Sequence, residues 1–407
     1  MDYVQRAFEH IRHLSETIGG RGSCSPNHRR AAEYSAEALR SAGVSQIEFE
    51  PFRGMASTYL PFALAFASAL TGTCLALFFG NRLTFGIAAL MNFLGAWAMF
   101  AESEFASNWT RWLIPTAETI NVTGAVSPQT KPKRQIILCS HLDTHRTPIF
   151  YSSTTWQKAF GVSVTGAFLS MVLSALTFGL GTLLDLNEFR WVGLLFGLVQ
   201  MYALTLVISA EFTPFSPGAN DNASGTGIIL ALAERLRAEP LTNTKVNFIF
   251  TDCEETGAHG ILAYLKKHAE AFGKDAVYII LDEVGAGQLK TVTEDGLIRK
   301  SKTHPRALEL ARNANFGLTQ SLIEAKGEAY TDALPATKQG LIALSISSAF
   351  PNPEQAVSHW HQMSDRIEFI DRQSLQDTFT FTWNILQAVD HQADAETISS
   401  FDSITSA

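Results

Sequence analysis

The stretch PGANDNASGTG, residues 217–227, places a carboxylate in a short loop directly before a helix. Pro217 and Gly218 interrupt the preceding segment, and the Asn, Asp and Ser residues that follow favour turns and helix caps. The next residues, GIILALAERLRAE, repeat apolar side chains at helical spacing, so Asp221 is predicted to lie just ahead of a helix N-terminus. Taken alone, Asp221 is explained as a helix cap.

Other acidic and imidazole side chains follow short apolar runs that have the composition of buried strands. In an open α/β sheet, ligands bind outside the carboxyl ends of the strands. We therefore expect these groups to meet Asp221 at one edge of a sheet. They are His141 and Asp143 in SHLDTH, Glu254 and Glu255 in DCEETGAHG, and Asp282 in ILDEVG.

Length and composition narrow the class of protein. The chain has 407 residues, of which 46% are hydrophobic and only 17% charged, which is apolar for a soluble enzyme of this size. The net charge of −8 provides no general basic surface, so nucleic acid is not expected as a partner. The cysteines, Cys24, Cys74, Cys139 and Cys253, are far apart and show neither a disulfide framework nor the spacing of a cysteine zinc site.

Four segments without Asp, Glu, Lys or Arg account for the apolar excess: residues 54–81, 83–101, 160–184 and 191–210. Each is about long enough to cross a hydrocarbon core of ~30 Å. They come in two pairs, separated around Asn81 and Arg82 and by DLNEFR, which predicts two transmembrane helical hairpins. The alternative is a set of buried core helices in a large soluble protein.

The order of elements predicts one discontinuous α/β domain interrupted by these hairpins. Helical and strand-like segments alternate from Asp221 onward. We assign residues 1–53, 102–157 and 211–392 to this domain, residues 54–101 to the first hairpin and residues 158–210 to the second. Residues 393–407 are predicted to be a poorly ordered polar tail. The first residues do not show the pattern of a signal peptide, which is a basic start followed by an apolar run. The first hydrophobic segment is therefore expected to act as an internal signal anchor.

Each polar group has an ordinary explanation, but together they have the chemistry of a set of metal ligands. In the pair His141 and Asp143, one ring nitrogen can bind a metal ion while the carboxylate holds the other; a strand-end histidine is otherwise an ordinary hydrogen-bonded residue. Of the adjacent Glu254 and Glu255, one can bind metal while the other takes a proton from a metal-bound water. The alternative for this pair is a solvated acidic loop.

Asp282 and His361 complete the set, and each has a competing neighbour, Glu283 and His359 respectively. Two imidazoles and three carboxylates without a thiolate suit Zn²⁺ and tolerate Mn²⁺ or Co²⁺. The set is sufficient for two ions that share one bridging carboxylate.

Five motifs in this order resemble the family of co-catalytic di-zinc exopeptidases that includes bacterial leucine aminopeptidases, glutamate carboxypeptidase and the glutaminyl cyclases. The motifs are SHLDTH, PGANDNASGTG, DCEETGAHG, ILDEVG and WHQMSD, and LSETIGGRGSCSP with RRAAEYSAEALRSAG resembles the opening of that family. The resemblance covers most of the chain outside the hairpins. It implies a zinc-exopeptidase-like α/β fold, with a mixed, mostly parallel central sheet and helices on both faces.

The resemblance also implies a role for each matching residue. Two zinc ions are held by His141, Asp221, Glu255, Asp282 and His361, with Asp221 as the bridge, Glu254 as general base and Asp143 orienting His141. Tyr330 is a candidate to hydrogen-bond the oxyanion, and Asp332 is a candidate on the substrate side or behind the ligands. The peptide bond after Asp221 is expected to be cis.

These observations predict a membrane-embedded, zinc-dependent exopeptidase, an aminopeptidase that hydrolyses peptides through a metal-bridged water with Glu254 as general base. No residue marks a pocket for a free amino or carboxyl terminus, so a carboxypeptidase is not separated from this prediction. Two alternatives keep the fold: a single-zinc acyltransferase similar to glutaminyl cyclases, and a non-catalytic receptor or scaffold.

The second hairpin leaves the α/β domain just after His141, and the chain returns to that domain just before Asp221. Both residues belong to the predicted site, so we expect this hairpin to rise from the active-site side of the domain. The expected partners are therefore peptides, including membrane-associated ones, and the lipid bilayer. Basic residues flank the hairpins on the catalytic side and favour a cytoplasmic catalytic domain, whereas the usual location of the family favours the other side. These basic residues are Arg53, Arg111, Arg146 and Lys158.

Overall fold

The computed structural model describes residues 2–327, 329–350, 352 and 359–405, with side chains up to residue 392. The chain divides into two compact units. Unit 1 contains residues 1–56, 117–145 and 215–407, and unit 2 contains residues 57–116 and 146–214. Each unit is therefore assembled from segments that are separated in the sequence.

Unit 1 is built around an eight-stranded sheet in which most neighbouring strands are parallel. The pairs β2–β4 and β6–β10 are antiparallel. The predicted mixed, mostly parallel α/β fold is confirmed. In spatial order the strands are β1 (Ser45–Met55), β2 (Thr116–Val126), β4 (Thr244–Thr251), β3 (Arg134–His141), β5 (Val277–Leu281), β10 (Ile342–Ala349), β6 (Gln288–Val292) and β9 (Ile323–Ala325). A two-stranded sheet is formed by β7 (Glu294–Asp295) and β8 (Ser301–Lys302).

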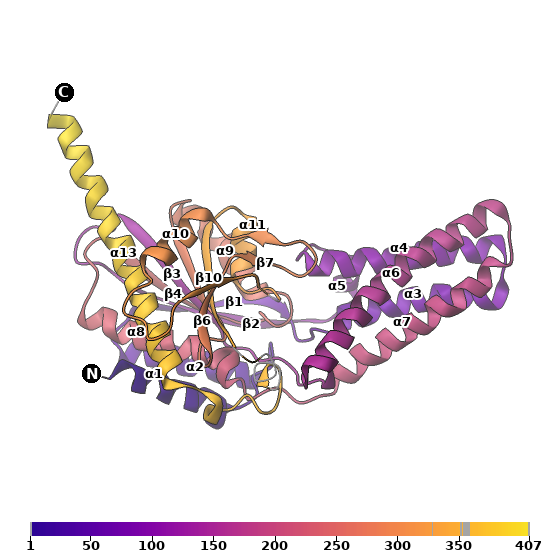
Figure 1. Cartoon of the computed structure of the whole chain (residues 1–407), viewed down its shortest axis with the longest axis horizontal. Coiled ribbons are helices and arrows are strands. Elements are labelled where there is room, and N and C mark those ends of the chain that lie inside the picture. Colours follow the sequence, from indigo (N-terminus) through magenta and orange to yellow (C-terminus); the bar gives the residue numbers. More distant parts are fainter. Residues whose placement is uncertain (1, 328, 351, 353–358, 406–407) are drawn as a thin grey trace. The chain divides into compact units, whose positions relative to one another are not determined.

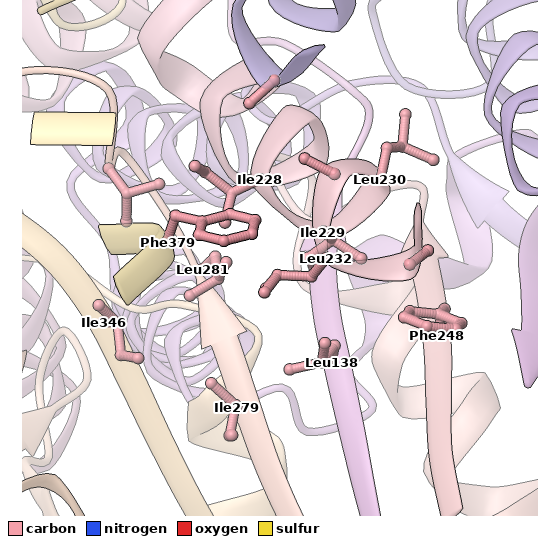
Figure 2. Packing of buried hydrophobic residues seen from close by; sticks show 14 of the residues in the cluster. Leu138, Ile228, Ile229, Leu230, Leu232, Phe248, Ile279, Leu281, Ile346 and Phe379 are labelled. Atoms are coloured by element: carbon pink, nitrogen blue, oxygen red, sulfur yellow. The ribbon is translucent and has the colours of Figure 1, made fainter. Parts of the chain in front are cut away.

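Helices cover both faces of this sheet, with α1 and α8 on the opposite side from α9 and α11 (Figure 1). Apolar side chains of α8 meet those of the central strands and of α13 in one continuous core (Figure 2). The helical elements of unit 1 are α1 (Tyr3–Arg12), η1 (His13–Ile18), α2 (Pro26–Ser41), η3 (Ala219–Ser224), α8 (Gly225–Ala238), α9 (His259–Phe272), α10 (Pro305–Asn313), α11 (Ala333–Lys338), η4 (Ile367–Phe369) and α13 (Arg372–Thr405).

The register of the central strands brings their carboxyl ends to one edge. His141 at the end of β3 pairs with Thr251 at the end of β4, and the parallel strand β5 ends at Leu281. β5 is buried along its whole length, and β3 and β4 along most of theirs, because helices cover both faces, which explains their continuous apolar runs. The polar residues that follow these strands therefore emerge close together.

Unit 2 contains four helices that are long and apolar enough to cross a membrane, as predicted from length and composition. They are α3 (Leu60–Phe79), α4 (Arg82–Ser103), α6 (Thr154–Leu184) and α7 (Phe189–Glu211), accompanied by the short elements α5 (Trp109–Leu113) and η2 (Ile149–Tyr151). Asn81 caps α4 in a reciprocal bond with Thr84, and Asp185 ends α6 in a left-handed conformation. Each pair of helices is thus a hairpin with a short polar turn.

A buried polar cluster joins all four long helices of unit 2. It contains Thr73 of α3, Asn92 of α4, Ser174 of α6 and Gln200 of α7, all with no exposed surface. Thr73 donates to Gln200 at 3.0 Å, and Gln200 donates to Asn92 at 2.8 Å and to Ser174 at 3.3 Å. Because the apolar side chains around them offer no hydrogen-bond partner, these four groups bond to one another, and the cluster stabilises one register of the four helices.

The ends of several elements differ from the predicted boundaries. β1 extends to Met55, two residues into the predicted first hairpin, and α6 begins at Thr154, ahead of the predicted start of the second. Helix α13 continues to Thr405. The order of the segment 393–407 stays a prediction. No Gly or Pro between residues 372 and 405 interrupts this helix.

The polar cluster of unit 2 predicts a specific loss of stability. Gln200→Leu removes three side-chain hydrogen bonds and leaves Asn92 and Thr73 without their partner on α7, so we expect a loss of about 1–2 kcal/mol. The measurement is the thermal unfolding midpoint in detergent. Met201→Leu, at a half-exposed position on the same helix, is the control. Equal midpoints for both variants would show that the cluster contributes nothing.

Candidate metal centre

The carboxylate of Asp221 lies between two imidazoles, with one oxygen facing each. Its Oδ1 is 3.3 Å from Nε2 of His141, and its Oδ2 is 3.1 Å from Nε2 of His361. Asp282 Oδ1 lies 3.3 Å from the same nitrogen of His141, and Glu255 Oε2 lies 3.6 Å from that of His361. All five side chains are buried. The structure therefore forms two adjacent donor groups that share Asp221.

The spacing and chemistry of both groups fit a zinc ion. Ligand atoms about 2.1 Å from a tetrahedral ion are separated by about 3.4 Å, and the four nitrogen–oxygen distances above lie close to this value. Imidazole and carboxylate donors are the usual ligands of Zn²⁺ outside cysteine sites. The residues present thus suit two ions, one at His141 and Asp282 and one at His361 and Glu255.

The structure also separates the competing candidates. Asp282 faces His141, whereas Glu283 forms no part of the donor groups found among the described residues. Nδ1–H of His359 donates to the carbonyl of Ser364 at 3.0 Å, and the ring stacks on Phe369, so its contacts lie away from Asp221. Asp282 and His361 are the members of these pairs that the structure brings to the site.

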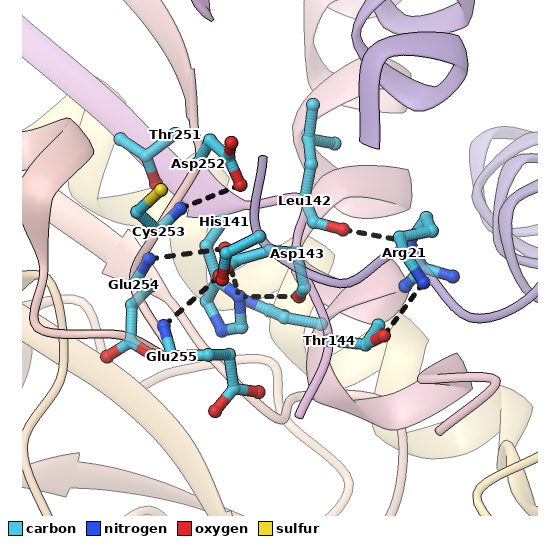
Figure 3. A network of polar contacts seen from close by, with 12 residues as sticks. Arg21, His141, Leu142, Asp143, Thr144, Thr251, Asp252, Cys253, Glu254 and Glu255 are labelled. Atoms are coloured by element: carbon cyan, nitrogen blue, oxygen red, sulfur yellow. Dashed lines mark hydrogen bonds and ion pairs between the residues drawn. The ribbon is translucent and has the colours of Figure 1, made fainter. Parts of the chain in front are cut away.

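Asp143 organises the backbone around the site (Figure 3). Its two carboxylate oxygens accept the main-chain N–H groups of Glu254 and Glu255, each at 3.2 Å, and Oδ2 also accepts the hydroxyl of Ser23 at 2.7 Å. Nδ1 of His141 is 3.0 Å from the main-chain carbonyl of Asp143 and 3.6 Å from its carboxylate. Asp143 therefore holds His141 as the resemblance implied, chiefly through its carbonyl, and additionally fixes the two glutamates.

The buried carboxylates of the site need positive charge nearby if they are to be ionised together. Burial raises the pKa of Glu254 and of Glu255 well above the ordinary value, and neighbouring carboxylates reinforce the shift. Burial also opposes ionisation of Asp221, but hydrogen bonds from His141 and His361 lower its pKa. Ionising all of these carboxylates together requires nearby cations. Two divalent ions in the donor groups would meet that requirement.

The loop that carries Asp221 is held from two sides. Asp365 accepts the main-chain N–H groups of Asn220 at 2.7 Å and Asp221 at 3.0 Å, and the Asn222 side chain donates to the Leu281 carbonyl at 2.8 Å. The peptide bond after Asp221 is cis, as the resemblance implied. Asp221 is consequently anchored to the end of β5 and to the segment after His361.

Arg21 connects this loop to the His141 segment through carbonyl groups. Its fully buried guanidinium donates to the carbonyls of Leu142, Pro217 and Gly218 at 2.8, 2.7 and 2.9 Å, and also to two carbonyls of the N-terminal segment. Burial lowers the pKa of Arg21 to about 10, while nearby aspartates counteract the shift, so the group stays charged at neutral pH. The sequence pattern gave no sign of this role.

Tyr330 and Asp332 lie beside the ligands. The Tyr330 hydroxyl donates to the main-chain carbonyl of Glu254 at 3.0 Å, which positions the predicted base. The Asp332 carboxylate accepts hydrogen bonds from Thr251 Oγ1 at 2.5 Å and from Cys139 Sγ at 3.6 Å, so it contacts the strands that carry the site. Burial raises the pKa of Asp332 to about 7. Their roles toward substrate stay predictions.

His145 is a site residue that sequence reasoning did not single out. It is the second histidine of SHLDTH and is buried. Its ring stacks on that of His361, with centroids 3.8 Å apart and an interplanar angle of 13°. One of its nitrogens lies within 4.8 Å of donor atoms of Glu255 and His361. The available signal was its place four residues after His141 in the same motif.

Known proteins share both the fold and the local sequence. Residues 205–386 match the sequence profile of peptidase family M28. The predicted resemblance to the zinc exopeptidases is thereby confirmed.

Solved structures with the same fold cover nearly the whole chain. A zinc aminopeptidase from Bacillus subtilis aligns over 95% of each chain, with a TM-score of 0.57 and 17% identity. The aminopeptidase from Aneurinibacillus sp. strain AM-1 aligns over 94% of this chain and 93% of its own, with a TM-score of 0.58 and 16% identity. Tannerella forsythia glutaminyl cyclase gives a TM-score of 0.56 at 16% identity, covering 94% and 98%.

Two curated relatives also match by sequence, each over part of its length. Aminopeptidase YwaD of Bacillus subtilis (strain 168) is 30% identical over 176 residues, which are 41% of this chain. The match spans 36% of that relative, so it supports similarity of the peptidase segment and leaves the rest of the two proteins uncompared.

The carbonyl contacts of Arg21 predict that lysine cannot replace it. A lysine ammonium has three donors and lacks the planar fork, so Arg21→Lys is expected to destabilise unit 1 by roughly 2–4 kcal/mol and to lower zinc content by loosening both site loops. Thermal unfolding and metal analysis measure the two effects. Arg29→Lys, at an exposed ion pair with Glu33 on α2, is the matched control. Unchanged zinc content in a folded Arg21→Lys protein would contradict the predicted link to the metal centre.

Proposed function

We propose that the protein is a membrane-embedded, zinc-dependent exopeptidase that removes residues from the amino terminus of peptides. The observation that carries the proposal is the position of Asp221, whose two oxygens face two separate histidine and carboxylate groups. The M28 profile and the aminopeptidases among the similar proteins support this reaction class. His141, Asp221 and Asp282 would hold one zinc ion, and Asp221, Glu255 and His361 the other.

When bound, the ions would polarise the scissile carbonyl and lower the pKa of an attacking water. Glu254 is placed to take the proton of that water and return it to the leaving amine. Its main chain is fixed on both sides, because its N–H donates to Asp143 and its carbonyl accepts the hydroxyl of Tyr330. Burial raises the pKa of Glu254, and bound cations would lower it again, so that the carboxylate can accept that proton.

Two alternatives share the fold. Glutaminyl cyclases are represented among the similar structures. An acyl transfer of that kind with a single zinc ion would use only one of the two donor groups that share Asp221. A receptor or scaffold would not require a carboxylate such as Glu254 to be buried beside both donor groups, where its desolvation is costly. The exopeptidase uses every one of these residues.

The base assignment predicts a separation of rate from metal binding. Glu254→Gln removes the proton acceptor but keeps the shape of the side chain, so hydrolysis of aminoacyl-anilides should fall about 10²- to 10⁴-fold while zinc content is unchanged. Glu270→Gln, at an exposed position on α9, is the control. Hydrolysis at the control rate would contradict the role of Glu254. Cyclisation of an N-terminal glutaminyl peptide without hydrolysis would favour the cyclase alternative.

We further propose that the substrates are peptides held at a membrane. The chain leaves unit 1 at His145 and returns at Phe215. His145 stacks on His361, and Phe215 packs on Gly20 and Gly22, the two neighbours of Arg21. The two residues of unit 1 that flank the helical segment therefore lie beside site residues. The four long apolar helices give the protein a means of residing in the bilayer.

A comparison of one peptide in two forms tests this substrate class. In liposomes, a peptide carrying a lipid anchor at its carboxyl terminus should be hydrolysed more efficiently than the same peptide without the anchor, because both partners are confined to one surface. A peptide with an acetylated amino terminus is the control for exopeptidase action. Equal kcat/KM values for the anchored and soluble peptides would remove the reason to invoke the membrane.

A further inference from the structure

Two cysteines that are 229 residues apart in the sequence lie together behind the proposed active site. Sγ of Cys24, in the loop between η1 and α2, is 3.4 Å from Sγ of Cys253, which directly precedes Glu254. Cys253 is buried and Cys24 is half-buried, and both are free thiols. The Cys24 thiol gives the pair an approach from solvent.

One carboxylate holds both cysteine backbones in place. Asp252 accepts the main-chain N–H of Cys24 at 3.0 Å through Oδ2 and that of Cys253 at 2.8 Å through Oδ1. Its Oδ2 also accepts the hydroxyl of Thr119 and lies 3.2 Å from Nδ1 of His28. With both oxygens already engaged, Asp252 is a positioning group and not a free metal ligand, although the three side chains lie close enough together to form a donor group.

A glycine leaves the space that the two sulfur atoms occupy. Gly54 of β1 faces the pair, and a Cβ there would lie 2.5 Å from Sγ of Cys253 and 3.3 Å from Sγ of Cys24. Sγ of Cys253 is 3.6 Å from the carbonyl of Met55. No larger residue at position 54 would leave room for both thiols.

We propose that Cys24 and Cys253 are a modification site, at which a low-molecular-weight disulfide oxidises the two thiols to an intramolecular disulfide. The Cys24 thiolate attacks one sulfur of that disulfide and expels the first thiol, leaving a mixed disulfide. The Cys253 sulfur then attacks Sγ of Cys24, forms the protein disulfide and expels the second thiol. The two protein thiols lose two electrons and two protons, and the small disulfide is reduced to two thiols.

The modification acts on the site through residues adjacent to the two cysteines. The sulfurs must approach from 3.4 Å to about 2.05 Å. Ser23 and Glu254, next to Cys24 and Cys253, both bond to the carboxylate of Asp143. Closing the disulfide therefore displaces groups that position Glu254, and hydrolysis should fall about 10- to 100-fold. This effect on hydrolysis rests on the proposed function, whereas formation of the disulfide does not.

The test is a titration of the detergent-purified full chain with oxidised and reduced glutathione, read by peptide mapping after alkylation and by aminoacyl-anilide hydrolysis. We expect a cross-linked Cys24–Cys253 peptide in the wild type and in Cys74→Ser, none in Cys24→Ser, and a loss of hydrolysis that dithiothreitol reverses. Cys74→Ser serves as the control because Cys74 lies on α3 in unit 2.

Each outcome decides one part of the proposal. Absence of the cross-linked peptide at every glutathione ratio in the folded wild type would overturn the modification site. A cross-link that leaves hydrolysis unchanged would overturn its effect on Glu254. If neither form hydrolyses any substrate, the proposed function is wrong, and the peptide map still decides the disulfide.

Discussion

The burial of several carboxylates at one edge of the sheet is the constraint on which the rest of unit 1 depends. Such groups are costly to desolvate unless cations and hydrogen bonds compensate them. The fold provides both kinds of compensation around Asp221: imidazoles on each side of its carboxylate, and main-chain N–H groups directed at Asp143 and Asp365. The remaining need for positive charge is what two zinc ions would satisfy.

The precision of the site comes from residues that bind no metal. Arg21 fastens the His141 and Asp221 segments through carbonyl groups, and Asp143 fixes the backbone of the two glutamates. These contacts join segments more than a hundred residues apart, so the donor groups form only once the sheet and its covering helices have assembled. In unit 2 buried polar groups likewise join segments that are distant in the sequence. One polar side chain from each long helix contributes to a single hydrogen-bonded cluster in apolar surroundings.

The α/β fold, the four apolar helices and the order of the site motifs could be predicted, because each follows from local periodicity or from a short motif. The pairing of donors could not, since it depends on strand register: periodicity does not show that Asp282 faces His141 while Glu283 does not. Sequence separation likewise hid the Cys24–Cys253 contact and the carbonyl contacts of Arg21. The starts of the two hairpins were missed by a few residues, because β1 continues to Met55 and α6 already begins at Thr154.

If the two oxygens of Asp221 serve two cations, its charge decides how many zinc ions the chain holds, and metal stoichiometry measures this. Zinc per chain and stepwise affinity are measured on the wild type and on Asp221→Asn, a variant of equal size that keeps one carbonyl oxygen and loses the charge. We expect two zinc ions in the wild type and at most one, more weakly bound, in the variant. A single ion in the wild type, or two equally tight ions in Asp221→Asn, would contradict this expectation.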